Sequence, residues 1–481
     1  MPSFFFHSDA GDGSFLARRL AREGHRVRMH ITYPKARDVA RGLVELVPRP
    51  SPARGDVIVF DSVHAGKTAD AFRRQGFRVI GGSRFADSIE LDRAAGMQLM
   101  QKAGIRTPET KIFKTYPEGV TFLKGQPQEE HWFFKPFGNI AACMTYDASI
   151  PRMLDHLAYC QENMEKPEGF LLQKKVEGVE LSLEGWFDGD KWVLPFNSTI
   201  EDKHFLNGNL GPRTGCMANL VFAYSDSRPT LVSRTLARIE PTLRAQRYVG
   251  PIDLNMIIDK EGEPYGLEWT ARFGYDALQG LCLLTAGDWG HQLADFANGR
   301  LESFNVDDSS YALTINTSVP PFPNTEYSES AKGKRLDPAI LLDPIRVMPR
   351  DVMLVSGRPQ IAGGDATVVT VGERGTDLWQ LRRDVLGIAK QFEIQDLQYR
   401  TDPVTRAETV LAELKRLLYD TPNIRVDTER PSIPYEIKGT VPAPSRPDLG
   451  RSNGRPVVRR EAARLQHDER PAETSAPFME Q

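Results

Sequence analysis

Short apolar segments alternate with helical patterns in the first hundred residues, and this alternation limits the fold more than any other feature of the sequence. Strand-like segments occur at residues 3–7 and at VRMHITY, DVIVFD and RVIGG, with a helical pattern over residues 14–23. Strands that alternate with helices favour a parallel sheet covered by helices. We therefore expect an N-terminal doubly wound α/β domain over residues 1–107.

Beyond residue 107 the patterns change to longer strands with interposed helices. Segments such as FLLQKKV, VELSLEGWFD and PIDLNMIID predict an α+β region over residues 108–310. Further strands and two amphipathic helical patterns predict a small C-terminal α/β module over residues 311–420. From residue 421 onward nine of 61 residues are proline, which predicts a disordered Pro-rich tail over residues 421–481.

Composition excludes several classes of protein. The net charge of -3 provides no overall attraction to nucleic acid or to an anionic membrane. Four cysteines without CxxC spacing disfavour a zinc or disulfide scaffold, and we expect them in the core: Cys143, Cys160, Cys216 and Cys282. No run of 18 apolar residues occurs, so we expect a cytoplasmic protein without a membrane anchor. The oligomeric state is left open.

Two strand ends carry side chains suited to a nucleotide. Lys135 follows the apolar run WFF, where its charge suits phosphate oxygens, although a solvated lysine at a strand end is the simpler alternative. In LLQKKVEGVELSL, a strand ending at Gln173 and Lys174 leads through a turn to Glu180. A strand edge with an apolar wall suits a purine and a carboxylate suits ribose hydroxyls, but a hairpin with a charged turn is the simpler alternative.

Two further segments favour an anion site and a cation site. EDKHFLNGNLGPRTGCM predicts a glycine-rich loop whose backbone N–H groups face an anion, with a plain flexible loop as the alternative. In LEWTARFG, Glu268 ends an apolar strand and is a candidate ligand of a hard cation, or half of an ion pair with Arg272. The glycines of SDAGDGSF, Gly11 and Gly13, lack the spacing of a dinucleotide fingerprint and indicate only an anion-binding turn.

Taken in order, these segments resemble the ATP-grasp ligases, and among them the phosphoribosylamine-glycine ligase family. EDKHFLNGNLGPRTGCM is similar to the family's loop with Gly-Pro-Asn-Thr-Gly, and NMIIDKEGEPYGLEWTARFG to its final strand pair ending in Glu-Phe-Asn-x-Arg-Phe-Gly. ATVVTVGERGTDLWQLRRDVLGIAK and LQYRTDPVTRAETVLAEL resemble the closing strand, helix and Arg-x-Asp segment. The resemblance covers about residues 1–420 and implies a two-subdomain ATP-grasp fold for residues 108–310.

The resemblance also implies a reaction and its participants. In the family, ATP phosphorylates the carboxylate of glycine, and the amine of phosphoribosylamine displaces phosphate from the acyl phosphate, a step of purine biosynthesis. Magnesium offsets the charge of the phosphates, with manganese as an alternative. The implied substrates of this chain are small molecules: ATP, an amino acid and a phosphorylated amine. No membrane and no nucleic-acid partner is implied.

The implied site residues fall into four groups. ATP would contact Lys135, Gln173, Lys174, Val176 and Glu180. The metal would be held by Glu268 and Thr270, and Arg272 would face the transferred phosphate as the catalytic residue. The substrate side would comprise Gly11, Gly13, Asp202, Gly211, Pro212, Arg213, Thr214, Gly215 and Gly274.

Departures from the family concern the phosphates, the metal and the substrate. KPFGNIAACMTY has alanine and Cys143 where the family has glycines and a second lysine, and Thr270 stands where the family has a metal-binding asparagine. Arg213 replaces an asparagine and Cys216 a glycine or glutamate on the implied substrate side. We therefore expect a divergent ATP-dependent carboxylate-amine ligase; the alternative is a degenerate nucleotide-binding protein without turnover.

Overall fold

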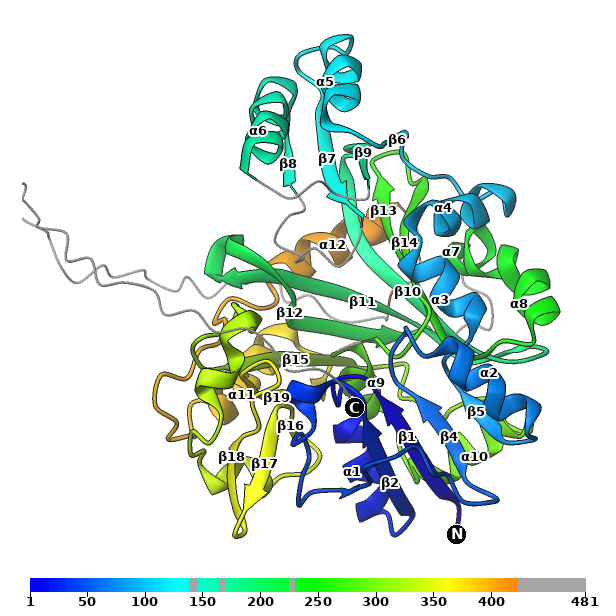
Figure 1. Cartoon of the computed structure of the whole chain (residues 1–481), viewed down its shortest axis with the longest axis vertical. Helices are drawn as coiled ribbons and strands as arrows, with labels where there is room; N and C mark the ends of the chain where they lie inside the picture. The colour runs from blue at the N-terminus through cyan, green and yellow to red at the C-terminus, as the bar shows by residue number, and fades with distance from the viewer. Residues whose placement is uncertain are drawn as a thin grey trace, which may run out of the picture. The chain divides into compact units, whose positions relative to one another are not determined.

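The N-terminal region is a parallel sheet with the strand order β3-β2-β1-β4-β5 (Figure 1). The computed structural model describes residues 1–137, 146–163, 169–224, 230–274, 276–417, 419 and 421. The strands of this sheet are β1 (Ser3–Ser8), β2 (Arg26–Ile31), β3 (Glu45–Leu46), β4 (Val57–Phe60) and β5 (Arg78–Ile80). Its helices are α1 (Ser14–Arg22), η1 (Pro34–Ala36), α2 (Gly66–Arg74), α3 (Arg84–Leu91) and α4 (Arg93–Lys102).

The strand order places a binding position at the carboxyl ends of β1 and β4. Strand β1 lies between β2 and β4. From β1 the strands continue through β2 to one edge of the sheet and through β4 to the other, so the strand order reverses at β1. In open α/β sheets, ligands bind beyond the carboxyl ends of the strands at such a switch point. The segments that follow β1 and β4 therefore face a natural site.

A four-stranded antiparallel sheet, ordered β6-β9-β7-β8, follows in the chain. It comprises β6 (Thr110–Phe113), β7 (His131–Pro136), β8 (Tyr146–Ser149) and β9 (Phe170–Lys174), with α5 (Tyr116–Lys124) and α6 (Ile150–Asn163). Trp132, Phe134 and Leu172 pack in the core beneath these helices. Because side chains alternate along a strand, Lys135 and Gln173 point to the other face.

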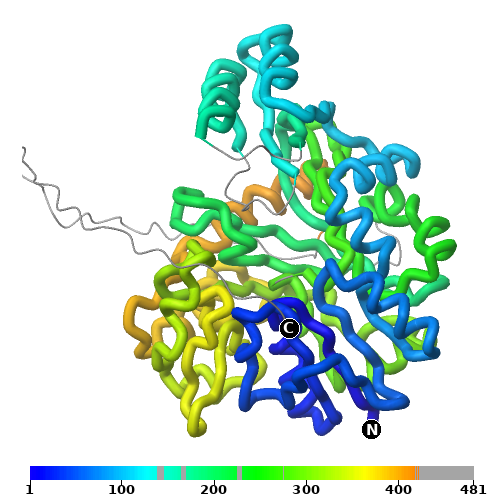
Figure 2. The backbone as a smooth tube through the Cα atoms, in the orientation of Figure 1, coloured from blue at the N-terminus to red at the C-terminus, as the bar shows by residue number. Residues whose placement is uncertain are grey.

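An eight-stranded antiparallel sheet forms the largest element, in the order β14-β13-β10-β11-β12-β15-β19-β16. Its strands are β10 (Gly178–Asp188), β11 (Trp192–Leu206), β12 (Leu210–Ala223), β13 (Val249–Asp259), β14 (Pro264–Thr270), β15 (Tyr311–Ser318), β16 (Val347–Pro349) and β19 (Thr367–Gly375). The pairing of β12 with β15, labelled in Figure 1, carries this sheet across the predicted boundary at residue 310; Figure 2 traces the same backbone in the same orientation. The boundaries of the predicted domains stay a prediction.

The remaining described elements surround this sheet or connect its strands. They are η3 (Asn207–Asn209), α7 (Thr230–Arg234), η4 (Leu236–Ile239), α8 (Glu240–Gln246), α9 (Ala277–Leu284), α10 (Trp289–Ala297), η5 (Thr325–Ala331), η6 (Pro338–Leu341), β17 (Val352–Val355), β18 (Arg358–Ile361), α11 (Leu378–Ala389) and α12 (Thr405–Arg416). The expected mixed class of helices and sheets is confirmed. None of the helices in the described ranges is long and apolar enough to cross a membrane.

One sequence prediction about local structure is wrong. The segment expected to be a glycine-rich loop is a hairpin, in which β11 runs to Leu206 and β12 resumes at Leu210. Only three residues, η3, form the turn, where Gly208 and Asn209 adopt positive φ. The two strands pair with each other along this segment, through His204 with Arg213 and Leu206 with Leu210, and this pairing favours strand over loop.

Three of the four cysteines confirm the prediction of core positions, since Cys160, Cys216 and Cys282 are buried and free. Cys143 and the altered phosphate segment at residues 138–145 lie outside the described residues. The predicted tail also lies outside them, except for Thr421.

Candidate functional site

The two faces of the eight-stranded sheet differ sharply in polarity. Leu181, Leu183 and Leu254 point into the apolar core on one face. The alternate residues carry polar groups to the other face, in two rows that cross neighbouring strands. The first row is Glu268, Asn255, Ser182 and Thr199, and the second is Thr270, Asp253, Glu184 and Asn197.

This polar face is costly to bury without partners. Most of its side chains are buried, and Thr199 Oγ1 and Thr314 Oγ1 have no hydrogen-bond partner among the described residues. An unsatisfied buried polar group costs about 1–3 kcal/mol. A face of this composition is therefore better suited to holding a polar ligand than to packing in a core.

Glu268 lies at the end of β14 and faces an open cleft. Its Oε2 accepts a hydrogen bond of 3.0 Å from Arg93 Nη1, and 42% of its side chain stays exposed. The surrounding protein by itself raises the pKa of Glu268, but Arg93, Lys135 and Lys203 outweigh this effect and lower it to about 2. The carboxylate is therefore ionised at any physiological pH and available to a cation.

The expected alternative, an ion pair between Glu268 and Arg272, does not form. Arg272 Nε instead donates to Glu90 Oε1 over 2.8 Å, and the other oxygen of Glu90 accepts from the Ala271 N–H at 2.7 Å. Asp92 separates helix α3 from helix α4 and is the N-cap residue of α4. Glu90 lies just before Asp92 and forms an ion pair with Arg272. Arg93 lies just after Asp92 and forms an ion pair with Glu268.

Lys135 projects from β7 toward the polar face. Its Nζ donates to Gln173 Oε1 at 3.0 Å, on the neighbouring strand β9. Loss of surrounding water lowers the pKa of Lys135 to about 8, while Glu268 and Glu180 act in the opposite direction. Lys135 and Glu268 thus interact electrostatically although they come from different sheets.

A second cluster of charges surrounds Glu180 on β10. Lys203 Nζ lies 3.2 Å from Glu180 and 3.0 Å from Glu201, and Arg406 of α12 lies 3.4 Å from Glu180. Burial acts to raise the pKa of Glu180, but Lys203 and Arg406 lower it below its usual value. Burial likewise opposes the charge of Lys203, yet Glu201 and Glu180 raise its pKa. Glu180 and Lys203 therefore both stay charged near neutral pH.

Two clefts open beside these charges. The first, here called the inter-sheet cleft, has a volume of about 520 Å³ and is lined by Phe133, Val176, Glu180, Arg213, Ile257 and Arg406, among others. The second, the switch-point cleft, has a volume of about 390 Å³ and is lined by Asp9, Ser62, Arg93, Glu268, Thr270 and Arg272, among others. Asp9 and Ser62 follow β1 and β4, so this cleft occupies the switch point of the N-terminal sheet.

The structure brings together only part of the expected substrate side. Of the hairpin residues, Arg213 lines the inter-sheet cleft and Thr214 Oγ1 donates to the Lys203 carbonyl, whereas Gly211, Pro212 and Gly215 are exposed. Asp202 is buried on β11. Gly274 lies against Glu184, because a Cβ on it would come within 3.5 Å of Glu184 Oε2.

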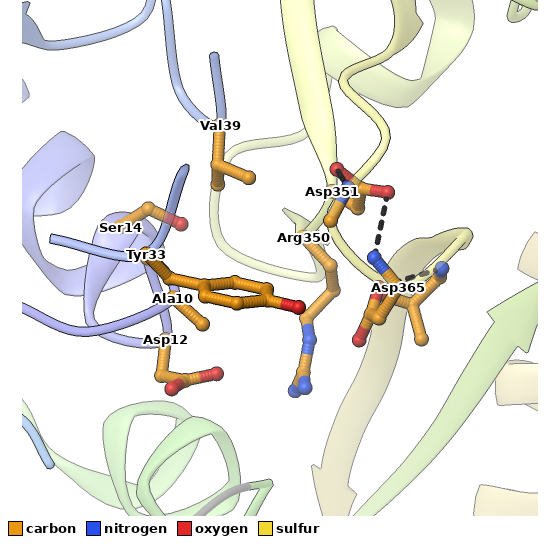
Figure 3. Close-up of a pocket in the computed structure, with 11 residues that line it drawn as sticks. Ala10, Asp12, Ser14, Tyr33, Val39, Arg350, Asp351 and Asp365 are labelled. Atoms are coloured by element: carbon orange, nitrogen blue, oxygen red, sulfur yellow. Dashed lines mark hydrogen bonds between the residues drawn. The ribbon is translucent and has the colours of Figure 1, made fainter. Parts of the chain in front are cut away.

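Gly11 and Gly13 form a turn whose N–H groups are already bonded within the chain. The Gly11 N–H donates to Ser8 Oγ at 2.8 Å and the Gly13 N–H donates to Asp61 Oδ2 at 2.6 Å. Gly11 lines a small pocket of about 60 Å³ together with Tyr33 and Arg350 (Figure 3). The turn therefore directs these two donors into the chain, and neither glycine lines the switch-point cleft.

The residues predicted to contact ATP lie on both faces of the four-stranded sheet or just beyond it. Gln173 faces Lys135, while Lys174 points to the helix side, where its Nζ pairs with Glu130 at 2.5 Å. The Lys174 N–H donates to the Glu109 carbonyl at 2.8 Å. Val176 lines the inter-sheet cleft just beyond the strand.

Several site residues were not identified from the sequence. Glu90 lies near the end of α3 and Arg93 at the start of α4, and neither belongs to a motif. Arg406 lies 226 residues from Glu180. Asn255 faces the same side as Glu268 on the neighbouring strand, a relation that only the register of β13 with β14 reveals. The alternation of polar residues along β10 and β13 was the sequence pattern that could have indicated a polar face.

Comparison with known proteins points to one group of enzymes. The chain matches no family model. It is 25% identical over 370 residues to the phosphoribosylamine-glycine ligase of Ralstonia nicotianae, covering 71% of this chain and 82% of the relative. It is 26% identical over 401 residues to the enzyme of the same name from Corynebacterium ammoniagenes, covering 79% of this chain and 88% of the relative. The resemblance inferred from the sequence motifs is confirmed.

Solved structures show the same fold at lower identity. The phosphoribosylamine-glycine ligase of Thermotoga maritima superposes with a TM-score of 0.62 at 18% identity, covering 83% of this chain and 99% of that one. The biotin carboxylase domain of Hydrogenobacter thermophilus 2-oxoglutarate carboxylase, solved with MgADP and bicarbonate, gives a TM-score of 0.56 at 11% identity, covering 86% and 98%. The chain thus has the fold of the ATP-grasp enzymes.

Proposed function

We propose that the chain is an ATP-dependent carboxylate-amine ligase similar to phosphoribosylamine-glycine ligase. The observation that carries this proposal is the convergence of Lys135, Glu180, Lys203 and Glu268, which belong to two different sheets yet form one electrostatic cluster. Charges of both signs that shift one another's pKa values suit a nucleotide with its metal, and Glu180 and Glu268 each line one of the two clefts.

The inter-sheet cleft suits the nucleotide. Its volume of about 520 Å³ lies within the usual range of small-molecule sites. Val176 and Ile257 supply apolar wall, and Glu180 supplies a carboxylate for ribose hydroxyls. Lys135 and Lys203 would then contact phosphate oxygens as point charges.

The ionised Glu268 suits a magnesium ion, since Mg²⁺ prefers carboxylate and other hard oxygen ligands. Arg93 donates to one oxygen of Glu268, Oε2, so the ion would use the other oxygen, Oε1. Thr270 offers a hydroxyl on the same strand, and Asn255 on the neighbouring strand offers the amide oxygen that position 270 lacks. The ion would neutralise charge on the phosphates.

On the substrate side, Arg272 and the switch-point cleft suit the carboxylate of an amino acid. Glu90 fixes Arg272 at the rim of this cleft, where a guanidinium can orient a carboxylate or a transferred phosphoryl group. The amine would attack the acyl phosphate from the same cleft. We keep Gly11, Gly13, Asp202, Gly274 and the 211–215 strand as proposed contacts of a phosphorylated amine.

The affinity for ATP should depend on pH through Lys135. Between pH 7 and pH 9 a lysine with a pKa of about 8 loses most of its charge, so we expect the affinity to fall about tenfold. The pKa values of Glu180 and Glu268 are lowered and that of Lys203 is raised, so these neighbours keep their charges in this range. Titration calorimetry at several pH values measures the effect.

Lys135→Arg is the matched control for this pH effect. Arginine keeps its charge to far higher pH, so the affinity of this variant should be nearly constant from pH 7 to pH 9. An equal loss of affinity in both proteins would show that another group titrates and that Lys135 does not contact phosphate.

The function is tested by ADP formation in the full chain supplied with Mg²⁺ and ATP. We expect sustained formation of ADP over many turnovers only when both a carboxylate and an amine are present, with glycine and phosphoribosylamine as the first pair of a panel. If ATP raises the melting temperature but no pair yields ADP, the ligase proposal fails. That outcome would favour a nucleotide-binding protein without turnover.

A further inference from the structure

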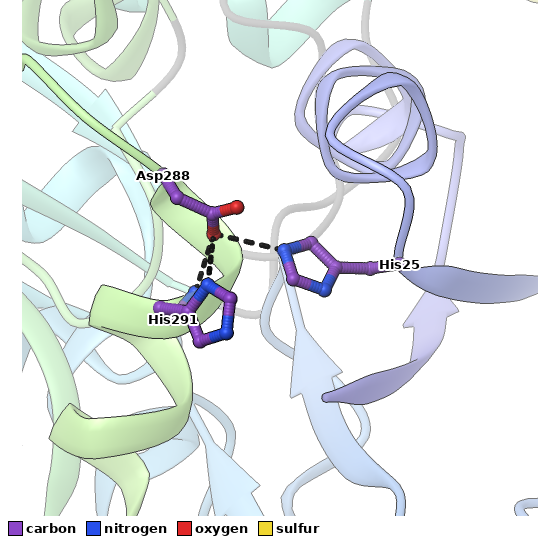
Figure 4. A group of neighbouring side chains, drawn as sticks. All are labelled: His25, Asp288 and His291. Carbon is purple, nitrogen blue, oxygen red and sulfur yellow. Dashed lines mark hydrogen bonds and ion pairs between the residues drawn. The ribbon is translucent and has the colours of Figure 1, made fainter. Parts of the chain in front are cut away.

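Two histidines and an aspartate meet where the turn before β2 contacts the start of α10 (Figure 4). His25 Nε2 lies 2.8 Å from Asp288 Oδ1, and His291 Nδ1 lies 3.1 Å from the same oxygen. These three atoms all lie within 4.8 Å of one another. The cluster is separate from both clefts, since none of the three residues lines either one.

The spacing of these atoms approaches that of metal ligands. In a tetrahedral zinc site with bonds of about 2.0–2.1 Å, neighbouring ligand atoms lie roughly 3.3 Å apart. The two measured separations, 2.8 Å and 3.1 Å, are only slightly shorter. Small side-chain movements would therefore admit an ion between the three atoms.

Packing within the fold fixes the position of the His25 ring. Its side chain is fully buried, with Phe4 at its edge, and its ring lies against Gly290 so closely that a Cβ there would come within 2.1 Å. Asp288 is the N-cap residue of α10 and its Oδ1 accepts the His291 N–H at 2.7 Å, which holds the two residues together at the start of the helix.

The other side of the cluster is open to solvent. The side chain of Asp288 is 34% exposed and that of His291 is 60% exposed. An ion therefore has a path of entry, and a water molecule has room to serve as a fourth ligand. Two imidazoles and one carboxylate match zinc better than magnesium, which prefers oxygen ligands alone.

We propose that His25, Asp288 and His291 bind a Zn²⁺ ion through His25 Nε2, Asp288 Oδ1 and His291 Nδ1. The ion would join the N-terminal sheet to α10 and stabilise their contact, as structural zinc sites do. The site is independent of the ligase activity and of the magnesium site at Glu268.

The test uses the full chain, stripped of metal with a chelator and then titrated with Zn²⁺ by calorimetry. We expect one tightly bound zinc per chain and a melting temperature raised by several degrees. Titration with Co²⁺ should produce the intense visible absorption of a tetrahedral site. Absence of zinc binding by the wild-type chain would overturn the proposal.

Three variants assign the binding to this cluster. His291→Ala, at an exposed position, should abolish binding of zinc without unfolding the chain. Asp288→Asn keeps an acceptor for the His291 N–H at the start of α10 but weakens the metal site, so it should lose zinc affinity while retaining metal-free stability. His131→Ala removes an exposed histidine elsewhere and should bind zinc normally. Normal zinc binding by His291→Ala would place the ion elsewhere and overturn the assignment.

Discussion

Replacement of Glu268 by glutamine should lower the rate of ADP formation about 10²–10³-fold, the range found when a group that stabilises transition-state charge is removed. Glutamine keeps the size of the side chain but removes the negative charge that magnesium requires. The loss should appear in the catalytic rate at saturating ATP, because the developing charge on the transferred phosphoryl group is no longer offset.

The stability of this variant should change little. The Arg93–Glu268 pair is 37% and 42% exposed, and an ion pair of that exposure contributes about 0–1 kcal/mol. Glu263→Gln is a matched control, because Glu263 also pairs with arginines and is 32% exposed but lies outside both clefts. Full activity of Glu268→Gln, or an equal loss in both variants, would remove Glu268 from the metal site.

Replacement of Asp276 by alanine should destabilise the chain by about 3–5 kcal/mol, the usual cost of removing one partner from a buried ion pair. Asp276 immediately precedes α9, is 3% exposed, and accepts hydrogen bonds from Arg350 and, at 2.6 Å, from Asn316. Without it, the guanidinium of Arg350, itself only 13% exposed, loses a buried carboxylate partner.

Chemical denaturation followed by circular dichroism measures this effect as a shift of the unfolding midpoint. Asp295→Ala is the matched control, since Asp295 pairs with Arg300 at the surface, where both side chains are largely exposed. The control should lower stability by about 0–1 kcal/mol. Equal midpoints for the two variants would show that the buried pair contributes no more than a surface one.

Local patterns in the sequence were sufficient for some parts of the site. The pair β13–β14 and its terminal Glu268 follow from two apolar runs around a KEGEP turn, because a hairpin is set by residues that are close in the chain. The parallel N-terminal sheet follows from the alternation of strands and helices for the same reason. The place of Lys135 near the end of β7 follows from the apolar run WFF before it, and its contact with ATP stays a prediction.

Contacts between segments that are distant in the chain could not be predicted from local sequence patterns. Arg93 and Glu268 are 175 residues apart, and no local pattern indicates that an arginine at the start of α4 holds that carboxylate. The hairpin β11–β12 was predicted as a loop because glycine and proline usually break strands, whereas the two strands pair with each other and their turn is bonded to Thr401 and Asp402. Tertiary pairing here outweighed local propensity.

The central claim, ligation through an acyl phosphate, is tested most directly with an amino acid whose carboxylate carries ¹⁸O. If the chain phosphorylates that carboxylate and an amine then displaces the phosphate, one labelled oxygen must pass from the amino acid to each phosphate released. We predict inorganic phosphate carrying one ¹⁸O atom when the full chain turns over Mg²⁺-ATP with the labelled amino acid and its amine partner. Unlabelled phosphate would show that ATP is only hydrolysed and would contradict the account.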